Sequence, residues 1–309
     1  MTYFNQAAKT LARNGWRPQH GLCLFAFVGL AILATWPAWA AMSQVVIRNE
    51  YARSSILVLP VIAWLVWVRR ARFRFVKPGG PGLGLVILVS GIHLYLVAHY
   101  VYALKTPWYL GALMIVVGAF LMCTGKSIIR PFLPAWLILP LLVPVPVTLA
   151  VLIAKPIQLF EAESIAALYG LFGVTVEVIT SPGTGRIVVG GETSGTAIPI
   201  NSVCKGLPTI LSLMLISFGF VFGSPMRAMA RSTLLLIAPF IALICSALLL
   251  GGTLWLYNGR PPLIATDLIR ALSEWATLLL AFLLIAGVLK LLTWASVPVH
   301  QYHLASTSS

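Results

Sequence analysis

Residues 232–256 read STLLLIAPFIALICSALLLGGTLWL, a run without a single Asp, Glu, Lys or Arg. A transmembrane helix needs about 20 consecutive apolar residues, so this stretch is long enough to cross a bilayer. The whole 309-residue chain has the same character, because 60% of its residues are hydrophobic and 9% are charged. A soluble domain is about a quarter charged. The sequence therefore predicts an all-α polytopic membrane protein and excludes a soluble fold.

Further stretches of this kind predict about eight transmembrane helices in total. The second stretch, residues 55–68, is short. Prolines interrupt the fifth stretch, residues 131–153, which predicts a kinked or partly unwound segment. The first stretch also has features of a secretory signal peptide, with a basic start and small residues at Ala38–Ala40, but we expect an uncleaved span. The predicted spans cover residues 21–41, 55–68, 83–104, 106–124, 131–153, 202–223, 232–256 and 275–295.

The net charge of +14 comes from 21 Lys and Arg against 7 Asp and Glu. Most of the cations alternate onto one side of the predicted spans, including the basic segment at residues 69–77, and all of the acids fall on the other side. The positive-inside rule places the cation-rich side and both termini in the cytoplasm. A basic segment also suits nucleic acid or anionic lipid, but no nucleic-acid module accompanies it. We therefore interpret the charge as an orientation signal.

One long segment outside the spans is organised, at residues 154–203 on the outer face. Residues 156–171 have apolar side chains at helical spacing, with Glu161 and Glu163 among them, which predicts an amphipathic helix on the membrane surface. Two β-branched runs around a Gly/Pro turn at residues 181–185 predict a β-hairpin before span six. We interpret residues 1–309 as a single domain with a short cytoplasmic tail at 296–309.

The four cysteines are the first candidates for a reactive side chain in this sequence. We interpret three of the four cysteines, Cys23, Cys123 and Cys245, as small hydrophobes in apolar helices. Cys204 differs, because it begins a predicted helix and precedes Lys205. The helix dipole and the adjacent ammonium both favour the thiolate. The spacing of His, Cys and acidic residues predicts no metal site and no cofactor.

Several segments of the chain follow one another as a succession of motifs. They are Ser55–Pro60 with Trp64–Arg70, the proline-rich Phe132–Pro146, Pro156–Gln158, Gly173–Val176, Val203–Leu207 and Ser224–Arg227. This succession resembles the exosortase/archaeosortase family of polytopic membrane cysteine transpeptidases, and the likeness runs over most of the chain. Val203–Leu207 stands where that family has its Ala-Cys-Ser-Gly-Leu nucleophile box.

The resemblance implies that Cys204 attacks an exported protein near its C-terminal sorting signal, which usually combines a Pro-Glu-Pro motif, a membrane helix and a basic tail. In the family an arginine late in span seven stabilises the oxyanion, and a histidine near the start of span eight acts as acid and base. The resemblance also implies the bacterial cytoplasmic (inner) membrane as location, and a link to exopolysaccharide or surface-protein export.

This sequence departs from that pattern at both supporting positions. The expected arginine region reads Cys245–Leu249, the expected histidine region reads Ser273–Thr277, and the family's His-Gly entry to span two reads Ser54-Ser55. His99, predicted at the outer end of span three, is the best substitute base, and Lys205 supplies positive charge beside Cys204.

Two functions from different classes remain open. The first is an exosortase-like cysteine peptidase or transpeptidase that acts through Cys204. The second is a non-catalytic scaffold that binds a membrane helix, a lipid-linked glycan or polysaccharide-export proteins. A glycan transporter or polymerase is less favoured, because the spans contain almost no ionisable side chains. Both main hypotheses require the lipid bilayer and no nucleic acid.

Overall fold

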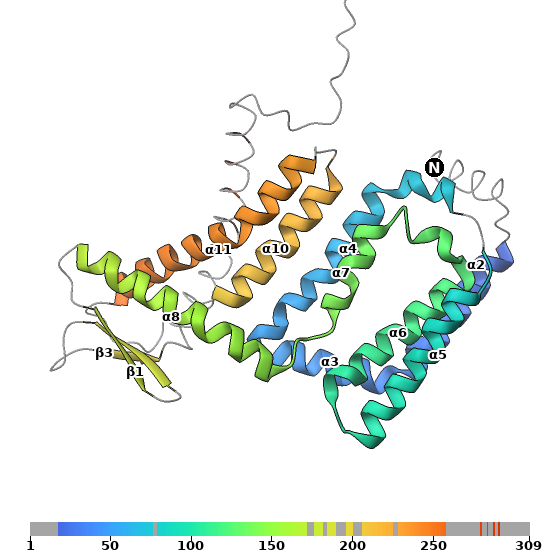
Figure 1. Cartoon of the computed structure of the whole chain (residues 1–309), viewed down its shortest axis with the longest axis horizontal. Coiled ribbons are helices and arrows are strands. Elements are labelled where there is room, and N and C mark those ends of the chain that lie inside the picture. Colours follow the sequence, from blue (N-terminus) through green and yellow to red (C-terminus); the bar gives the residue numbers. More distant parts are fainter. Residues whose placement is uncertain are drawn as a thin grey trace, which may run out of the picture. The chain divides into compact units, whose positions relative to one another are not determined.

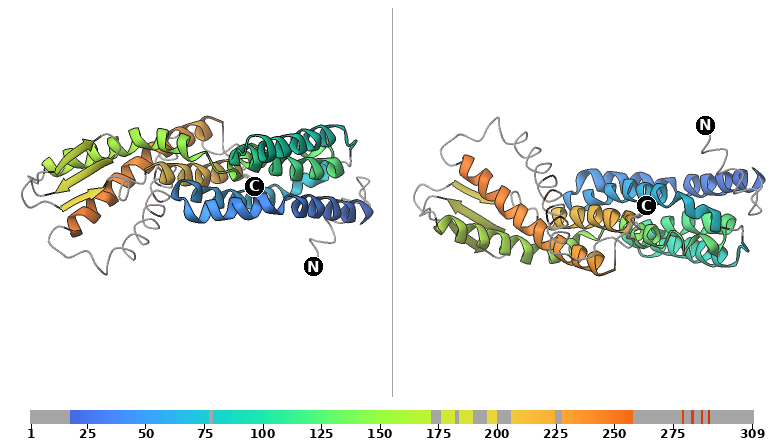
Figure 2. Two further views of the ribbon diagram at one scale, coloured as in Figure 1. Left: turned by 90° about the horizontal axis from the view of Figure 1, so that it is seen from below. Right: turned by 90° about the horizontal axis from the view of Figure 1, so that it is seen from above.

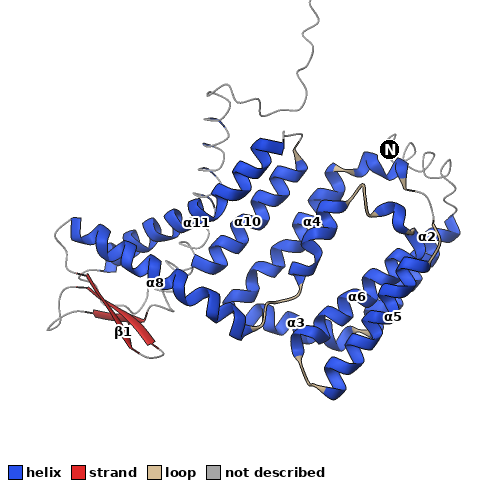
Figure 3. Ribbon diagram, viewed as in Figure 1, coloured by secondary structure: helices blue, strands red, loops and turns tan. Residues whose placement is uncertain are grey.

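The structure is a computed structural model that describes residues 18–76, 79–171, 176–181, 184–189, 196–199, 206–224 and 228–257, and positions 279, 283, 287 and 290. Helices make up most of this part of the chain, and its strands belong to one three-stranded sheet (Figure 3). The chain divides into two compact units, Met1–Pro146 and Val147–Ser309, each of which is described by itself.

The first unit is a set of apolar helices joined by short 3₁₀ or π turns (Figure 1). In chain order they are α2 (Pro18–Ala34), α3 (Trp36–Arg48), η1 (Glu50–Leu57), α4 (Val58–Val68), η2 (Arg70–Phe75), α5 (Gly82–Leu96), η3 (Val97–Val101), α6 (Lys105–Thr124), η4 (Lys126–Ile128), α7 (Leu133–Ile138) and η5 (Leu139–Leu142).

Helices α5 and α6 form an antiparallel pair that packs backbone against backbone (Figure 1). A Cβ added at Gly118 would lie 2.6 Å from the backbone nitrogen of Leu88, and one at Gly111 would lie 2.7 Å from that of Tyr95. Gly91 on α5 approaches α6 in the same way. Small residues are the usual means by which membrane helices approach closely, because lipid supplies no hydrophobic force between them.

The first apolar stretch differs from the prediction of one span over 21–41. It forms two helices, Gln19–Ala34 and Trp36–Arg48, with a bend of 67° at Thr35. Pro37 explains the break, because a proline lacks the N–H that would continue the hydrogen bonds of α2. The hydroxyl of Thr35 donates to the carbonyl of Ala31 at 2.7 Å and accepts a hydrogen bond from the indole Nε1 of Trp39 at 2.8 Å. Hydrogen bonds from Thr35 to Ala31 of α2 and from Trp39 of α3 to Thr35 therefore both stabilise the bend.

Four described helices are long and apolar enough to cross a membrane, and up to six if each of two broken helix pairs counts as one span. The mostly helical, many-spanning class is thus confirmed, whereas the number eight stays a prediction. The sixth predicted span is represented by the shorter apolar helix Leu207–Gly223, and the eighth lies outside the described residues apart from four helical positions. The four long helices are Tyr51–Val68, Gly82–Val101, Lys105–Thr124 and Met229–Leu248.

The basic segment after α4 is folded onto its neighbours. Arg69 and Arg72 both donate from Nη1 to the carbonyl of Pro131, at 3.3 and 3.5 Å. The rings of Phe73 and Phe132 lie 4.7 Å apart. These contacts give part of the basic segment a structural role in addition to the orientation signal that we infer from its charge.

In its described residues, the second unit contains three helices and the sheet. Helix α8 (Val147–Leu171) precedes strands β1 (Val176–Ser181), β2 (Thr184–Val189) and β3 (Thr196–Pro199), and α10 (Gly206–Gly223) and α11 (Ala228–Tyr257) follow. Strands β1 and β2 pair antiparallel from Val176 opposite Val189 to Ser181 opposite Thr184, and β3 pairs antiparallel with β2. Helix α8 contacts β1, α10 and α11, as Figure 2 shows from two sides.

Helix α8 differs from the predicted boundary between a fifth span and a separate surface helix. The helix is continuous from Val147 to Leu171 and contains Pro156. The break predicted from the prolines is confirmed, because residues 143–146, which include Pro144 and Pro146, leave the helical conformation between η5 and α8. Residues expected on a membrane surface therefore belong to a helix that packs against the rest of its unit.

Candidate functional site

Cys204 and Lys205, the predicted nucleophile and its neighbour, lie outside the described residues. The chain is described up to Pro199 at the end of β3 and again from Gly206, where α10 begins. The candidate site is therefore built from the elements that lead into and out of this segment. These elements are the sheet, α10, and the helices α8 and α11 that contact α10.

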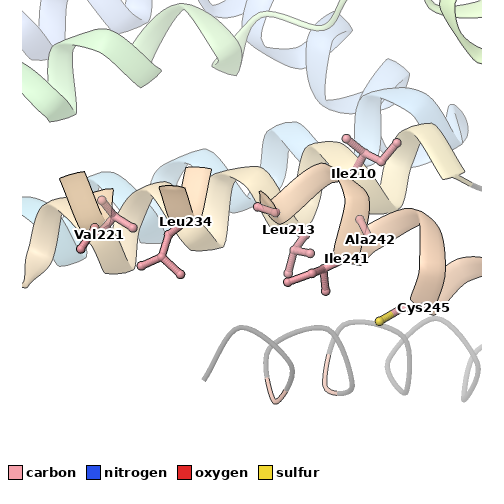
Figure 4. Packing of buried hydrophobic residues seen from close by; sticks show 9 residues of the cluster. Ile210, Leu213, Val221, Leu234, Ile241, Ala242 and Cys245 are labelled. Atoms are coloured by element: carbon pink, nitrogen blue, oxygen red, sulfur yellow. The ribbon is translucent and has the colours of Figure 1, made fainter. Parts of the chain in front are cut away.

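The interface between α10 and α11 is an apolar core (Figure 4). Leu213 and Ala242 are fully buried there, and Ile157 of α8 packs against the same cluster. The sulfur of Cys245 belongs to this core, with 0% of the residue exposed. The buried members are Ile210, Leu213, Val221, Ala230, Leu234, Ala238, Ile241, Ala242 and Cys245. Cys245 is thus packed as a small hydrophobe, in agreement with its interpretation from the sequence.

Two polar side chains on α8 are buried although the sequence predicted a surface helix here. Glu161 is 1% exposed and Gln158 is 5% exposed, whereas Glu163 is exposed. Of the two acids in the predicted amphipathic helix, Glu161 therefore lies on the buried side and Glu163 on the exposed side. The helical spacing of the sequence indicates the burial of Glu161, because this residue stands four residues after Ile157 and four before Ile165, on the apolar side of the helix.

His99, the predicted substitute base, is exposed and lies in the π turn η3 at the end of α5. Its ring stacks on the indole of Trp108 with centroids 4.6 Å apart and planes inclined by 24°. The ring of Tyr100 meets it edge-on at 4.8 Å. π turns of a single helical turn occur often at functional sites. His99 belongs to the first unit and Cys204 to the second. The described ring contacts of His99 are with Tyr95, Tyr100 and Trp108 of its own unit.

No described part of the chain holds a metal-ligand group. Within the described ranges, no three His, Cys, Asp or Glu residues lie close enough together to bind a metal ion. Two buried polar side chains of α8 belong to the second unit: the amide of Gln158 can donate and accept hydrogen bonds, and the carboxyl of Glu161 can also gain or lose a proton.

Comparison with known proteins decides the family. A family model described as transmembrane exosortase matches residues 39–287, most of the chain. The chain belongs to the transmembrane exosortase family. No curated protein and no solved structure matches it significantly. The match begins in α3 of the first unit and extends beyond α11 of the second, so the family region covers most of both units of this exosortase.

Two departures of this exosortase from the family pattern fall on described residues. Where the resemblance implies the arginine region of span seven, α11 has Cys245 and Ser246, both of which are buried. Where the resemblance implies the His-Gly entry to span two, η1 has the buried serines Ser54 and Ser55. Side chains with no charge fit these interiors without the desolvation cost that an arginine carries in a membrane.

Proposed function

We propose that this exosortase binds the C-terminal sorting segment of membrane-anchored exported proteins, at the outer face of the bacterial inner membrane, and acts on them through Cys204. The observation that carries the proposal is the family match over residues 39–287, which includes the Cys204 box. In this proposal both units form one exosortase-like domain with both termini in the cytoplasm. The substrates connect it to exopolysaccharide or surface-protein export.

The start of α10 supports Cys204 as the nucleophile. Helix α10 begins at Gly206 and runs to Gly223, so the segment with Cys204 and Lys205 directly precedes a long helix. The positive end of the helix dipole and the ammonium of Lys205 both favour a thiolate. A thiolate is the form of cysteine that attacks a peptide carbonyl.

His99 is the proposed outer-face base from the first unit. Its imidazole is exposed and therefore open to solvent or substrate at one side, while Trp108 holds the ring by stacking. Histidine is the commonest general base in enzymes. Replacement of His99 by Phe keeps a ring of similar size on Trp108 and removes the proton acceptor. A matched Tyr100→Phe variant keeps the neighbouring ring of the same aromatic cluster.

A non-catalytic scaffold is the second candidate. The observation that favours it is the apolar packing of Cys245 in the segment where the family's arginine is expected. In this case the chain binds a membrane helix or polysaccharide-export proteins without cleaving a peptide bond.

Replacement of Cys204 by Ala in the native host distinguishes the two functions. Processing of proteins with sorting signals and output of extracellular polymer are measured together, with Cys23→Ala as control because Cys23 is exposed on α2. The enzyme predicts loss of processing in Cys204→Ala and normal processing in the control. Unchanged processing with lost polymer contradicts the peptidase and supports the scaffold.

A further inference from the structure

Five of the basic side chains described in the first unit lie at the end where α4 and α6 both finish. Helix η2, which follows α4, contacts η4, which follows α6. An apolar cluster joins these elements, and its buried members are Val76, Leu121, Ile128 and Phe132. Four of the five basic residues are exposed and Arg69 is half-buried. This basic end of the first unit consists of Arg69, Arg70, Arg72, Lys126 and Arg130.

Two arginines of the basic end converge on one atom. Nη1 of Arg69 and Nη1 of Arg72 both donate to the carbonyl oxygen of Pro131, at 3.3 and 3.5 Å. Two positive guanidinium groups held this close repel each other. A guanidinium has five N–H donors, and Arg72 is exposed, so this residue can bind an anion and keep its contact with Pro131. An anion bound here would offset the repulsion.

No acid of the first unit lies at its basic end. The first unit contains one acidic residue, Glu50, at the start of η1. The candidate span Tyr51–Val68 separates Glu50 from Arg69, and residues 51–146 contain no Asp or Glu. A helical span of this length measures about 27 Å, so Glu50 is too far away to pair with these arginines. The charge of the basic end is therefore not offset by an acid of its own unit.

The exposed side of α4 continues from the basic end as an apolar surface. Trp64, Trp67 and Val68 are exposed there, and the exposed side of a membrane span meets lipid acyl chains. Cζ of Arg70 lies 4.5 Å from the centroid of the Trp67 ring. Tryptophan is typical of the level at which the hydrocarbon meets the headgroups. The pair Arg70 and Trp67 therefore connects an acyl-chain surface with a cluster of positive charge.

From this arrangement we propose that the basic end binds the headgroup of an anionic phospholipid, whose acyl chains lie on the exposed side of α4. Guanidinium groups bind phosphate oxygens through paired N–H donors, and Arg70 and Arg72 provide these donors. Basic sites between membrane helices on the cytoplasmic side bind anionic headgroups, and the proposed orientation places the basic end on that side. An orientation signal requires only the number of cations, whereas a headgroup site requires their convergence.

Native mass spectrometry of the full chain in dodecyl maltoside tests the headgroup preference. The chain is titrated with dioleoylphosphatidylglycerol and, as matched control, with dioleoylphosphatidylcholine, which has the same acyl chains and no net charge. We expect the anionic lipid to bind at least about tenfold more tightly. Its affinity should fall as the salt concentration rises, because salt screens the charges. Equal affinity for the two lipids overturns the proposal.

Two double variants locate the site. The first combines Arg70→Gln with Arg72→Gln. The second combines Arg53→Gln with Lys105→Gln, which removes the same charge from exposed side chains at the opposite ends of α4 and α6. Each basic side chain at an anionic surface contributes about fivefold in affinity. The first variant should therefore bind phosphatidylglycerol at least about tenfold more weakly, whereas the second stays within about twofold. Equal losses in both variants overturn the assignment to the basic end.

Two further measurements complete the test. If the first double variant does not fold, Arg70→Gln decides, because the described contact of this exposed side chain is with the exposed ring of Trp67. It should weaken binding about fivefold, and unchanged affinity contradicts the proposal. Displacement of the lipid by an equal concentration of inorganic phosphate also contradicts it, because the site then recognises phosphate alone. All these titrations are made without a peptide substrate, so their results do not depend on the function of Cys204.

Discussion

The helices of the two units pack through different side chains. Helices α5 and α6 of the first unit meet at glycines, whereas α8, α10 and α11 of the second unit meet through larger side chains. Glycines on both helices let α5 and α6 approach closely, with Gly84 and Gly91 seven residues apart on one helix and Gly111 and Gly118 seven apart on the other. Seven residues are close to two helical turns, so each pair lies on one face. The second unit packs larger side chains such as Leu213 and Leu234 instead.

The buried polar groups can be compared between the two units as well. In the first unit, the hydroxyls of Thr35 and Thr124 donate to the carbonyls four residues earlier, at 2.7 and 2.9 Å. The indole Nε1 of Trp108 in the first unit and the hydroxyl of Ser217 in the second are both buried without a hydrogen-bond partner among the described residues. The units differ in a buried carboxyl group, because Glu161 of the second unit is buried, whereas the buried polar side chains described in the first unit are Thr and Ser.

The largest effect on stability is expected from Gly118→Leu. Its side chain would meet the backbone of Leu88, so α5 and α6 must separate, at a cost of about 3 kcal/mol. Gly29→Leu is the control, because nothing lies within 4 Å of the corresponding Cβ on α2. The free energy of unfolding in detergent measures both variants. Equal stability of the two variants would contradict the close packing of α6 against α5 through Gly118.

Leu213→Ala tests side-chain packing in the second unit. Leu213 is fully buried between α10 and α11, and its truncation is expected to cost about 2 kcal/mol, chiefly through the cavity that it leaves. The adjacent Met214 is exposed, so Met214→Ala should change stability little. Thermal unfolding of both variants, followed by helical circular dichroism, gives the comparison. A larger loss in Met214→Ala would show that the assignment of the buried face is wrong.

Thr35→Val removes the hydroxyl that links Ala31 and Trp39 at the bend of the first span. The hydrogen bond from Trp39 is lost without a change in side-chain shape, at an expected cost of about 1 kcal/mol. Tryptophan emission should shift as well, because the indole N–H loses its partner. No change in either quantity would mean that Pro37 alone maintains the bend.

Ser217→Ala is expected to have the smallest effect and the opposite sign. A buried hydroxyl without a partner opposes folding, so its removal should stabilise the protein by up to about 1 kcal/mol. If this variant instead loses stability as Thr35→Val does, Ser217 is hydrogen-bonded in the folded protein, and its interpretation as a buried hydroxyl without a partner is wrong. Equilibrium unfolding in detergent measures both variants under the same conditions.

Composition and hydropathy sufficed to predict the class and the positions of most described helices. Helix α6 begins one residue from its predicted start and ends at the predicted residue, because its apolar run ends at Gly125, which has a φ of 72° and ends helices readily. The bend at Thr35 was not predicted. It depends on Pro37 within an unbroken apolar run and on a Thr–Trp hydrogen bond, neither of which changes mean hydropathy.

The candidate site was only partly predictable. The family motif identifies Cys204 and Lys205 from local sequence, but the burial of Glu161 depends on which side of α8 meets α10 and α11. Average hydropathy treats Glu161 and Glu163 alike, although helical phase separates them by about 200°. His99 is exposed beside Trp108, and this stacking results from the π turn that no composition rule anticipates.

Trapping of the covalent intermediate tests the central claim most directly. The purified full chain is mixed with a sorting-signal peptide, quenched in acid within the first turnover, digested and analysed by mass spectrometry. The account predicts a thioester adduct on the peptide that contains Cys204, absent from Cys204→Ala. Cleavage of the substrate without an adduct on Cys204, or an adduct on Cys23, Cys123 or Cys245 instead, would contradict it.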